Sequence, residues 1–307
     1  MPFLRLPTGL LALAAALLAP APARACSVCA CGDPLAAVAE TPGNRGSLRL
    51  SLEAETLTMT AGSETMPGMT DDLTQSTLRL GVTWSPLTTL NLVAIVPFTR
   101  KQMVETGMGM DTPMSDLTGL GDVELGVRWF AFEKVDFGAR TSQSGAVMAG
   151  TSFPTGSDDA TSNGRRVDQH GQLGTGSFGP YLGLFYRLSG DAWSGFATVA
   201  GRWHTENSYG YRYGQSLQWA LQGQWQSGSW FAASLALDGR SAAADRDSGA
   251  DVANTGGLVL ALTPAVHFNV FSGGWLFARA QLPVYTALLG EQTVGPVFTA
   301  GIRYEAL

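Results

Sequence analysis

Sulfur-bearing side chains gather in three short stretches of this sequence, where they could bind a soft metal ion. Three cysteines follow one another closely near the N-terminus: Cys26, Cys29 and Cys31. Five methionines lie in two segments further along the chain: Met66, Met69, Met108, Met110 and Met114. Thiolate and thioether sulfur atoms select Cu(I), and a close pair such as Met66 and Met69 lets two sulfur atoms converge on one ion. The pattern makes Cu(I) the candidate metal.

Both sulfur groups also have an interpretation without metal. Three cysteines in an oxidising compartment allow one disulfide and one free thiol as readily as a three-thiolate site. The cysteines lack the histidine of a haem-attachment motif and the second half of a structural zinc site. Methionines in loops can equally serve as flexible apolar contacts. The sequence leaves these alternatives open.

Arginine supplies nearly all the basic charge, since Lys101 and Lys134 are the only lysines. Ten ionisable residues fall on the polar face of alternating segments and are the candidate interior residues: Arg49, Glu53, Arg79, Glu124, Arg128, Arg187, Arg202, His204, Arg279 and Arg303. The favoured interpretation is a network of arginine–carboxylate pairs that fills a narrow interior. The other is an arginine-lined track that attracts small anions.

Apolar and polar side chains alternate with period two along most of the chain. In the clearest segment, Leu217, Trp219 and Leu221 alternate with Gln218 and Gln222. Successive side chains of a strand point to opposite faces, whereas a helix with period 3.6 would mix the two sets. One face of each such strand suits lipid and the other suits water.

About twelve segments share this pattern, an even number typical of bacterial outer-membrane barrels. We expect strands near 46–58, 75–85, 87–103, 119–132, 134–153, 177–189, 191–207, 215–227, 229–240, 255–270, 273–288 and 293–305. The prediction is an all-β fold, a transmembrane antiparallel up-and-down β-barrel with short periplasmic turns and long extracellular loops. A soluble sandwich or lipocalin-type barrel also alternates, but aromatic strand ends and alternating loop lengths disfavour it.

The first residues have the pattern of a secretory signal. Residues 1–25 combine a basic start at Arg5, an apolar run and a small-residue cleavage site. Residues 26–45 would then form a periplasmic segment that carries the cysteines, with lipidation of Cys26 as an alternative. Residues 46–307 would form the barrel, and the formal net charge of −6 gives no indication of nucleic-acid binding.

Catalytic motifs are weak in this sequence. We considered His170, His204 and His267 as partners of a serine, because some outer-membrane barrels of this size are phospholipases, and found no convincing pair. No strained serine elbow, paired-histidine metal motif or phosphate loop occurs. We therefore predict that the protein is not an enzyme.

Three motifs in order along the chain resemble a known family. They are the Cys26–Pro34 stretch CSVCACGDP, the Gly119–Leu125 stretch GLGDVEL and the Leu282–Tyr285 stretch LPVY. Together they are similar to outer-membrane barrels grouped with MetA-type phenol-degradation proteins, over most of the mature chain. The resemblance implies an outer-membrane channel or transporter.

The combined prediction is a channel or transporter for a small solute, with copper or another soft metal as a candidate associated ion. The alternative is a closed barrel whose cysteine segment and methionine-rich loops act in sensing or recruitment. Expected partners are outer-membrane lipid, the barrel-assembly machinery and the solute or metal ion, without nucleic acid. The expected location is the outer membrane of a Gram-negative bacterium, with both termini in the periplasm.

Overall fold

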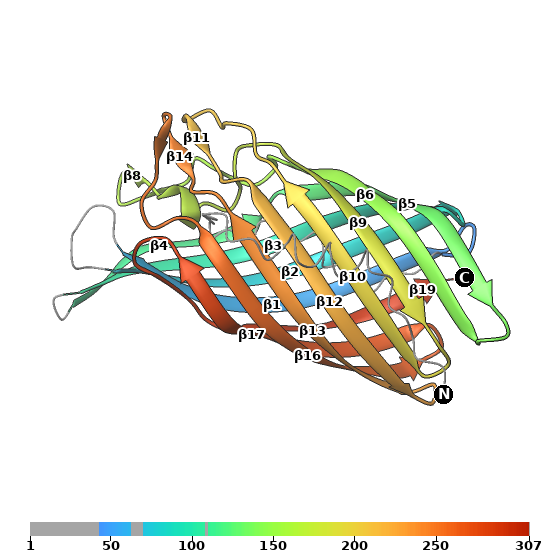
Figure 1. Cartoon of the computed structure of the whole chain (residues 1–307). Coiled ribbons are helices and arrows are strands. Elements are labelled where there is room, and N and C mark those ends of the chain that lie inside the picture. The colour runs from blue at the N-terminus through green and yellow to red at the C-terminus, as the bar shows by residue number, and fades with distance from the viewer. Residues whose placement is uncertain (1–42, 63–69, 108–109, 307) are drawn as a thin grey trace.

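A computed structural model describes residues 43–62, 70–107 and 110–306, which form one β-barrel (Figure 1). The fourteen strands of its sheet are β1 (Leu48–Gly62), β2 (Thr70–Leu87), β3 (Leu90–Gly107), β4 (Met110–Leu120), β5 (Val123–Asp136), β6 (Thr141–Phe153), β9 (Gly179–Ser189), β10 (Trp193–Arg202), β12 (Ser216–Ser227), β13 (Phe231–Ala242), β16 (Gly257–Phe271), β17 (Gly274–Leu288), β18 (Gln292–Val294) and β19 (Val297–Ala306). Each pairs antiparallel with its neighbours.

The sheet closes because β1 pairs with both β2 and β19. Strands β4 and β5 both pair with β3, and β18 and β19 both pair with β1, so the wall is a closed twelve-stranded antiparallel barrel. The predicted fold class is confirmed. No helix in the described ranges is long and apolar enough to cross a bilayer.

The outer face of the barrel carries an apolar belt. Its exposed residues include Leu50, Leu52, Leu78, Leu80, Phe98, Leu125, Val127, Leu182, Leu184, Leu221, Leu235, Leu237, Leu262, Val266, Leu276, Leu282 and Phe298. The alternation read from β12 holds, since Leu221 is 56% exposed on this face and Gln218 is 6% exposed on the inner face. Exposed tryptophans lie at one rim of the belt: Trp84, Trp129, Trp193, Trp225 and Trp230. An apolar band edged by aromatic rings is the surface that a membrane barrel presents to lipid.

The two ends of the barrel differ in their connections. At the short-turn end, tight turns join consecutive strands, and Leu48 at the start of β1 pairs with Ala306 at the end of β19. At the long-loop end, residues 154–178, 203–215 and 243–256 form long connections. These contain the small hairpins and turns β7 (Thr161–Ser162), β8 (Arg165–Arg166), η1 (Gln169–Gly171), β11 (Tyr211–Arg212), β14 (Arg246–Asp247) and β15 (Ala250–Asp251).

Several expected boundaries are wrong. The strand expected over 191–207 ends at Arg202. The expected strands 119–132 and 134–153 place a tight turn at Glu133, but β5 continues to Asp136, whose carboxylate accepts a hydrogen bond from the Ala139 backbone N–H. This local bond fixes the turn, and Arg140 completes it with φ 54°.

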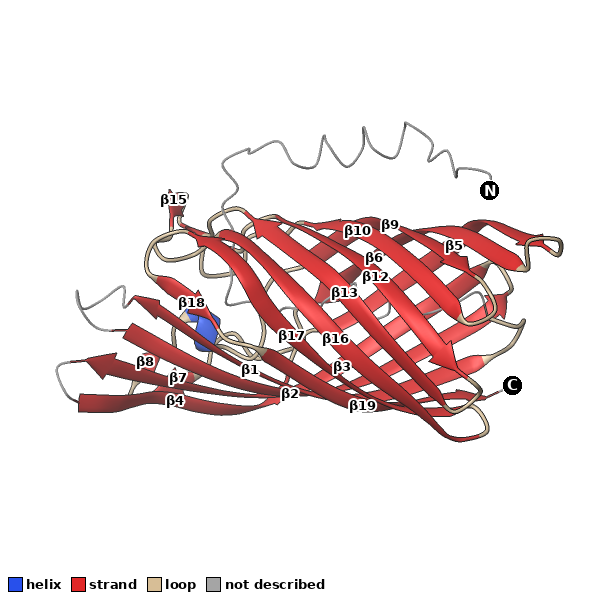
Figure 2. Cartoon of the chain, turned by 60° about the horizontal axis from the view of Figure 1, so that its bottom comes forward, coloured by secondary structure: helices blue, strands red, loops and turns tan. Residues whose placement is uncertain are grey.

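Another wrong boundary lies before residue 119, where the expected strands leave a loop. Instead β4 extends the sheet along β3 (Figure 2), with Arg100 and Asp116 joined across the two strands by hydrogen bonds of 3.0 and 2.7 Å. The edge of β3 offers unpaired backbone groups at this level, and β4 satisfies them.

Candidate functional site: the interior of the barrel

Strand register brings charged residues from distant parts of the sequence into rows across the inner wall. In one row, His267 of β16 lies opposite Phe277 of β17, which lies opposite Gly301 of β19. Gly301 lies opposite Glu53 of β1, and Glu53 lies opposite Arg79 of β2. Phe277 leans over Gly301, where an added Cβ would come within 2.8 Å of the phenyl ring, so a side chain at this position would displace the ring.

Two interior ion pairs are short and buried. Arg79 Nη2 lies 2.7 Å from Glu55 Oε1, with both side chains less than 10% exposed. Arg202 Nη2 lies 2.5 Å from Glu124 Oε2, and Arg202 also donates to the backbone carbonyl oxygen of Gly179. Arg49 Nε lies 3.2 Å from Glu305 Oε2, a carboxylate outside the ten candidate interior residues. These contacts are those of a packed arginine–carboxylate network.

Aromatic rings fill the part of the interior formed by β5, β6, β9 and β10. Arg128 lies 5.4 Å from the centre of the Phe185 ring, and Arg187 lies 5.6 Å from that of Phe196. The buried cluster around them is Phe130, Ala146, Met148, Tyr181, Phe185 and Phe196. Guanidinium groups stacked on aromatic faces occupy this side of the barrel with side chains.

The opposite side of the interior holds a cavity of about 200 Å³. It lies against β12, β13, β16, β17, β19 and β1, and Arg279 and Arg303 project into it from β17 and β19. Two smaller cavities of about 30 and 60 Å³ lie beside it. Arg79 lines all three cavities, so its side chain stands where they meet.

The cavity lies where strand pairing in the wall is interrupted. Pairing of β17 with β19 ends at Gln281 and Val297, although β17 continues beside β16 to Leu288. Pro283 and Val294, on the two sides of this seam, both line the cavity.

At the long-loop end, the connection 154–178 folds inward and is held to the wall. The Lys101 ammonium donates to the carbonyl oxygens of His170 and Gln172 at 3.0 and 2.6 Å. The Asp122 carboxylate accepts from the Thr175 backbone N–H and hydroxyl at 2.8 and 2.6 Å. The Gln172 side chain is fully buried. Its amide oxygen accepts a hydrogen bond from the Ala160 backbone N–H, and its amide nitrogen donates one to the Ala160 carbonyl oxygen.

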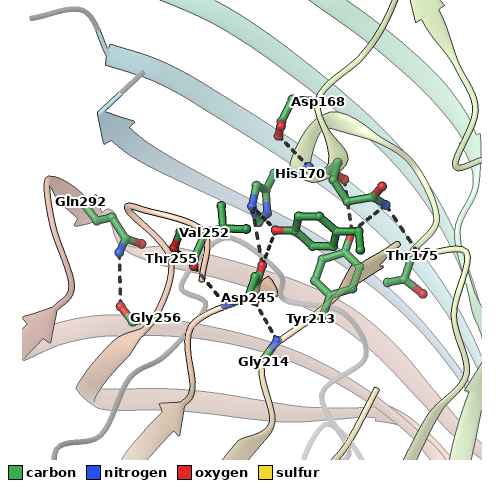
Figure 3. Close-up of polar contacts among 12 residues, drawn as sticks. Asp168, His170, Thr175, Tyr213, Gly214, Asp245, Val252, Thr255, Gly256 and Gln292 are labelled. Carbon is green, nitrogen blue, oxygen red and sulfur yellow. Dashed lines mark hydrogen bonds and ion pairs between the residues drawn. The ribbon is translucent and has the colours of Figure 1, made fainter. Parts of the chain in front are cut away.

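A buried cluster joins this loop to the other two long connections (Figure 3). The Tyr211 hydroxyl donates to Asp245 Oδ2 at 2.7 Å and lies 3.0 Å from His170 Nε2. Asp245 is fully buried and also accepts from the Gly214 backbone N–H. The Gln169 amide bonds the Tyr213 hydroxyl at 3.0 Å. Three loops thus form one hydrogen-bonded plug across the long-loop end.

Acidic residues gather beside this plug, beyond the apolar belt that begins at Leu78 on β2. Burial, together with the negative charges of Glu105, Asp168 and Asp72, raises the pKa of Asp71 to about 6. Within the described ranges, no group of His, Cys, Asp and Glu has the geometry of a metal site.

The candidate metal ligands fall mostly where the structure gives no description. Cys26, Cys29, Cys31, Met66, Met69 and Met108 lie outside the described residues. Met110 begins β4, and Met114 is half-buried further along that strand.

The three histidines take different positions. His170 belongs to the plug, and the His204 ring lies 5.4 Å from that of Tyr213. His267 stacks on Phe277, and its Nε2 lies 3.5 Å from the Ser234 hydroxyl, a contact that the sequence did not reveal.

The plug residues Tyr211, Asp245 and Gln172 were also missed. They lie in loops without periodicity, and the one available signal was the concentration of Gln, His, Tyr and Asp in those loops.

No protein-family profile and no curated protein matches this sequence. Among solved structures, an outer-membrane channel from Pseudomonas putida F1 is similar over 90% of this chain and 100% of that chain, with TM-score 0.67 and 12% identity. The translocator domain of the autotransporter NalP from Neisseria meningitidis covers 88% of this chain and 92% of its own, with TM-score 0.48 and 13% identity. At these identities the first likeness shows the fold alone, and this chain has the fold of an outer-membrane β-barrel.

Proposed function

We propose that this protein is an outer-membrane channel for a small solute. The observation that carries the proposal is the cavity of about 200 Å³ inside a closed barrel whose outer face is an apolar belt. A water molecule needs only about 10–15 Å³ of such space, so the cavity has room for a small organic molecule. Charged and apolar groups both line it, as in ligand pockets that orient their contents.

The orientation in the membrane follows from the two ends of the barrel. In outer-membrane barrels, short turns face the periplasm and long loops face the exterior. With this orientation, both ends of the described chain lie on the periplasmic side and the plug faces the exterior. The expected environment is outer-membrane lipid, and the expected assembly route is the barrel-assembly machinery.

Side chains restrict the path through the barrel in this conformation. The plug covers the long-loop end, and the Arg79–Glu55 pair separates the large cavity from the two smaller ones. A barrel of twelve strands lies between small side-chain-filled barrels and wide porins. We therefore propose slow passage of small solutes through rearranging side chains and loops.

Solute-driven swelling of vesicles tests this function. Liposomes that contain the refolded full chain are expected to swell in isosmotic glycine and much more slowly in the trisaccharide raffinose, because the narrow lumen excludes the larger solute. Liposomes with the protein inserted but swelling no faster than protein-free liposomes would count against a channel and favour the closed barrel.

An enzymatic role has little support from the interior. The Ser234–His267 contact of 3.5 Å is long for a catalytic pair. We infer that His267 has a packing role.

Association with copper is a second proposal, supported by strand register at the long-loop end. Gly62 pairs with Thr70 across β1 and β2, and Thr70 pairs with Thr106 across β2 and β3. Gly107 pairs with Met110 across β3 and β4. The strand ends that lead into the two methionine segments are therefore neighbours in the sheet.

Replacing Met66, Met69, Met108 and Met110 together by isoleucine is expected to weaken Cu(I) binding, because thioether ligands select this ion. Competition of the refolded protein with a colorimetric Cu(I) chelator measures the effect. Met148→Ile, in the aromatic cluster of the wall, is the matched control and should bind as the wild type does. Unchanged affinity in the fourfold variant would exclude a loop site, and a Cys→Ser variant at positions 26, 29 and 31 would then test the cysteine segment.

A further inference from the structure

Arg279 and Arg303 form only long ion pairs with the nearby carboxylates. Arg279 Nη2 lies 3.9 Å from the carboxylates of Glu53 and Glu55, and Arg303 Nη2 lies 3.7 Å from Glu53. Neither guanidinium group donates a hydrogen bond to another residue within the described part of the chain. Their side chains are 26% and 28% exposed, whereas Arg202 in its tight pair is 3% exposed. The two guanidinium groups thus face the cavity with donors to spare.

The charges around the cavity favour an anion. Four guanidinium groups line it: Arg79, Arg240, Arg279 and Arg303. The carboxylates that line it are Glu55 and Asp238, and Glu53 lies directly behind the arginine pair. The Asp238 carboxylate already accepts a hydrogen bond from Thr263. Four positive groups against three carboxylates leave an excess of positive charge.

On β1, β18 and β19 the end of the cavity toward the long loops is apolar. The lining residues there are Leu57, Met59, Val294 and Val297. Across the cavity, Arg240 and Asp238 of β13 lie opposite Val259 and Ala261 of β16. Val294 and Val297 pack against the buried cluster that contains Leu57 and Met59. On β1 the lining thus changes from charged at Glu55 to apolar at Met59, and on β19 it changes from charged at Arg303 to apolar at Val297. The cavity is therefore amphipathic along the side formed by β1, β18 and β19.

We propose that Arg279 and Arg303 form a binding subsite for the carboxylate of a small organic anion whose apolar body lies against the apolar end of the cavity. A guanidinium group binds a carboxylate through parallel, charge-assisted hydrogen bonds, which suits two partly exposed arginines that both approach the Glu53 carboxylate. A cation is repelled by the excess positive charge. A neutral apolar molecule of the same shape leaves the two guanidinium groups unsatisfied. The role of this subsite in passage rests on the proposed channel function.

Calorimetric titration of the refolded full chain in detergent micelles tests the ligand class. The probes are sodium benzoate, formate, benzyl alcohol and benzylamine, which separate the charge from the apolar body. Benzoate is expected to bind more tightly than the other three, because only benzoate satisfies both ends of the cavity. Benzyl alcohol or benzylamine binding as tightly as benzoate would overturn the proposal. Formate binding as tightly as benzoate would show that the apolar end of the cavity does not contribute to binding.

The double variant Arg279→Gln and Arg303→Gln tests the residues. Loss of two charge-assisted contacts is expected to weaken benzoate binding roughly tenfold or more. Arg100→Gln removes the same charge from the outer face of the extended sheet and is expected to leave binding unchanged. Heat-modifiable gel migration verifies that each variant is folded.

Equal benzoate affinity in the folded double variant and the wild type would refute the subsite. Should the double variant not fold, the ranking of the four probes on the wild type still decides the ligand class, and each single variant tests its own arginine. Binding in micelles requires no passage. Benzoate binding without vesicle swelling therefore contradicts the channel alone, and swelling without benzoate preference contradicts the subsite alone.

Discussion

Replacing Arg79 with alanine is expected to raise the single-channel conductance several-fold. Arg79 lines all three interior cavities, and no other described residue does so. Removing its long side chain joins these spaces into one continuous volume. Glu55 keeps Arg279 at 3.9 Å and a hydrogen bond from Thr299, so its charge is not left isolated. Planar-bilayer recordings of the refolded variant beside the wild type measure the change.

Gln222→Ala is the matched control for this prediction. Gln222 also has a long polar side chain, but it lines only the large cavity and neither of the two smaller ones. Its removal widens one space without connecting it to the others, so conductance should stay near that of the wild type. Equal conductance of the Arg79→Ala variant and the wild type would show that Arg79 does not limit the path.

Glu124→Ala is expected to be the most destabilising of the single substitutions considered. Glu124 and Arg202 are both almost completely buried and lie 2.5 Å apart. Removing one partner of a buried ion pair leaves an uncompensated charge and costs about 3–5 kcal/mol. The free energy of unfolding, from urea titration of the barrel in lipid vesicles followed by tryptophan fluorescence, measures the loss.

Asp116→Ala provides the exposed comparison. Asp116 also forms a short pair with an arginine, Arg100, but both side chains are about half exposed. Solvent screens such pairs, so little change is expected. Replacing both Glu124 and Arg202 by methionine should recover much of the stability, because no buried charge then remains unpaired. A Glu124→Ala variant as stable as Asp116→Ala would contradict the buried-network account.

The barrel was predictable from the sequence because its wall repeats a local rule. Each strand alternates between lipid and interior, so Leu221 and Gln218 reveal their faces without knowledge of their neighbours. The same rule predicted which arginine side chains point into the interior, although it did not predict which carboxylates they pair with. Glu53 lies directly opposite Arg79, yet Arg79 bonds Glu55, two residues further along β1.

The plug and the cavity depend on contacts that no local rule contains. Lys101 bonds carbonyl groups about seventy positions away, and Tyr211 meets Asp245 and His170 from three separate loops. The cavity exists because one side of the interior carries a cluster of large aromatic residues, while small residues such as Ala236, Ala261 and Ala265 line the other side. Which side remains hollow becomes apparent only when twelve strands are closed into a ring.

The most direct test of the channel is the conductance of the refolded wild-type chain in a planar bilayer under a salt gradient. The cavity and its excess of positive charge predict small, steady conductance steps with a reversal potential that shows anion selectivity. A bilayer that stays silent while the inserted protein is shown to be folded would contradict the central claim and favour a closed barrel.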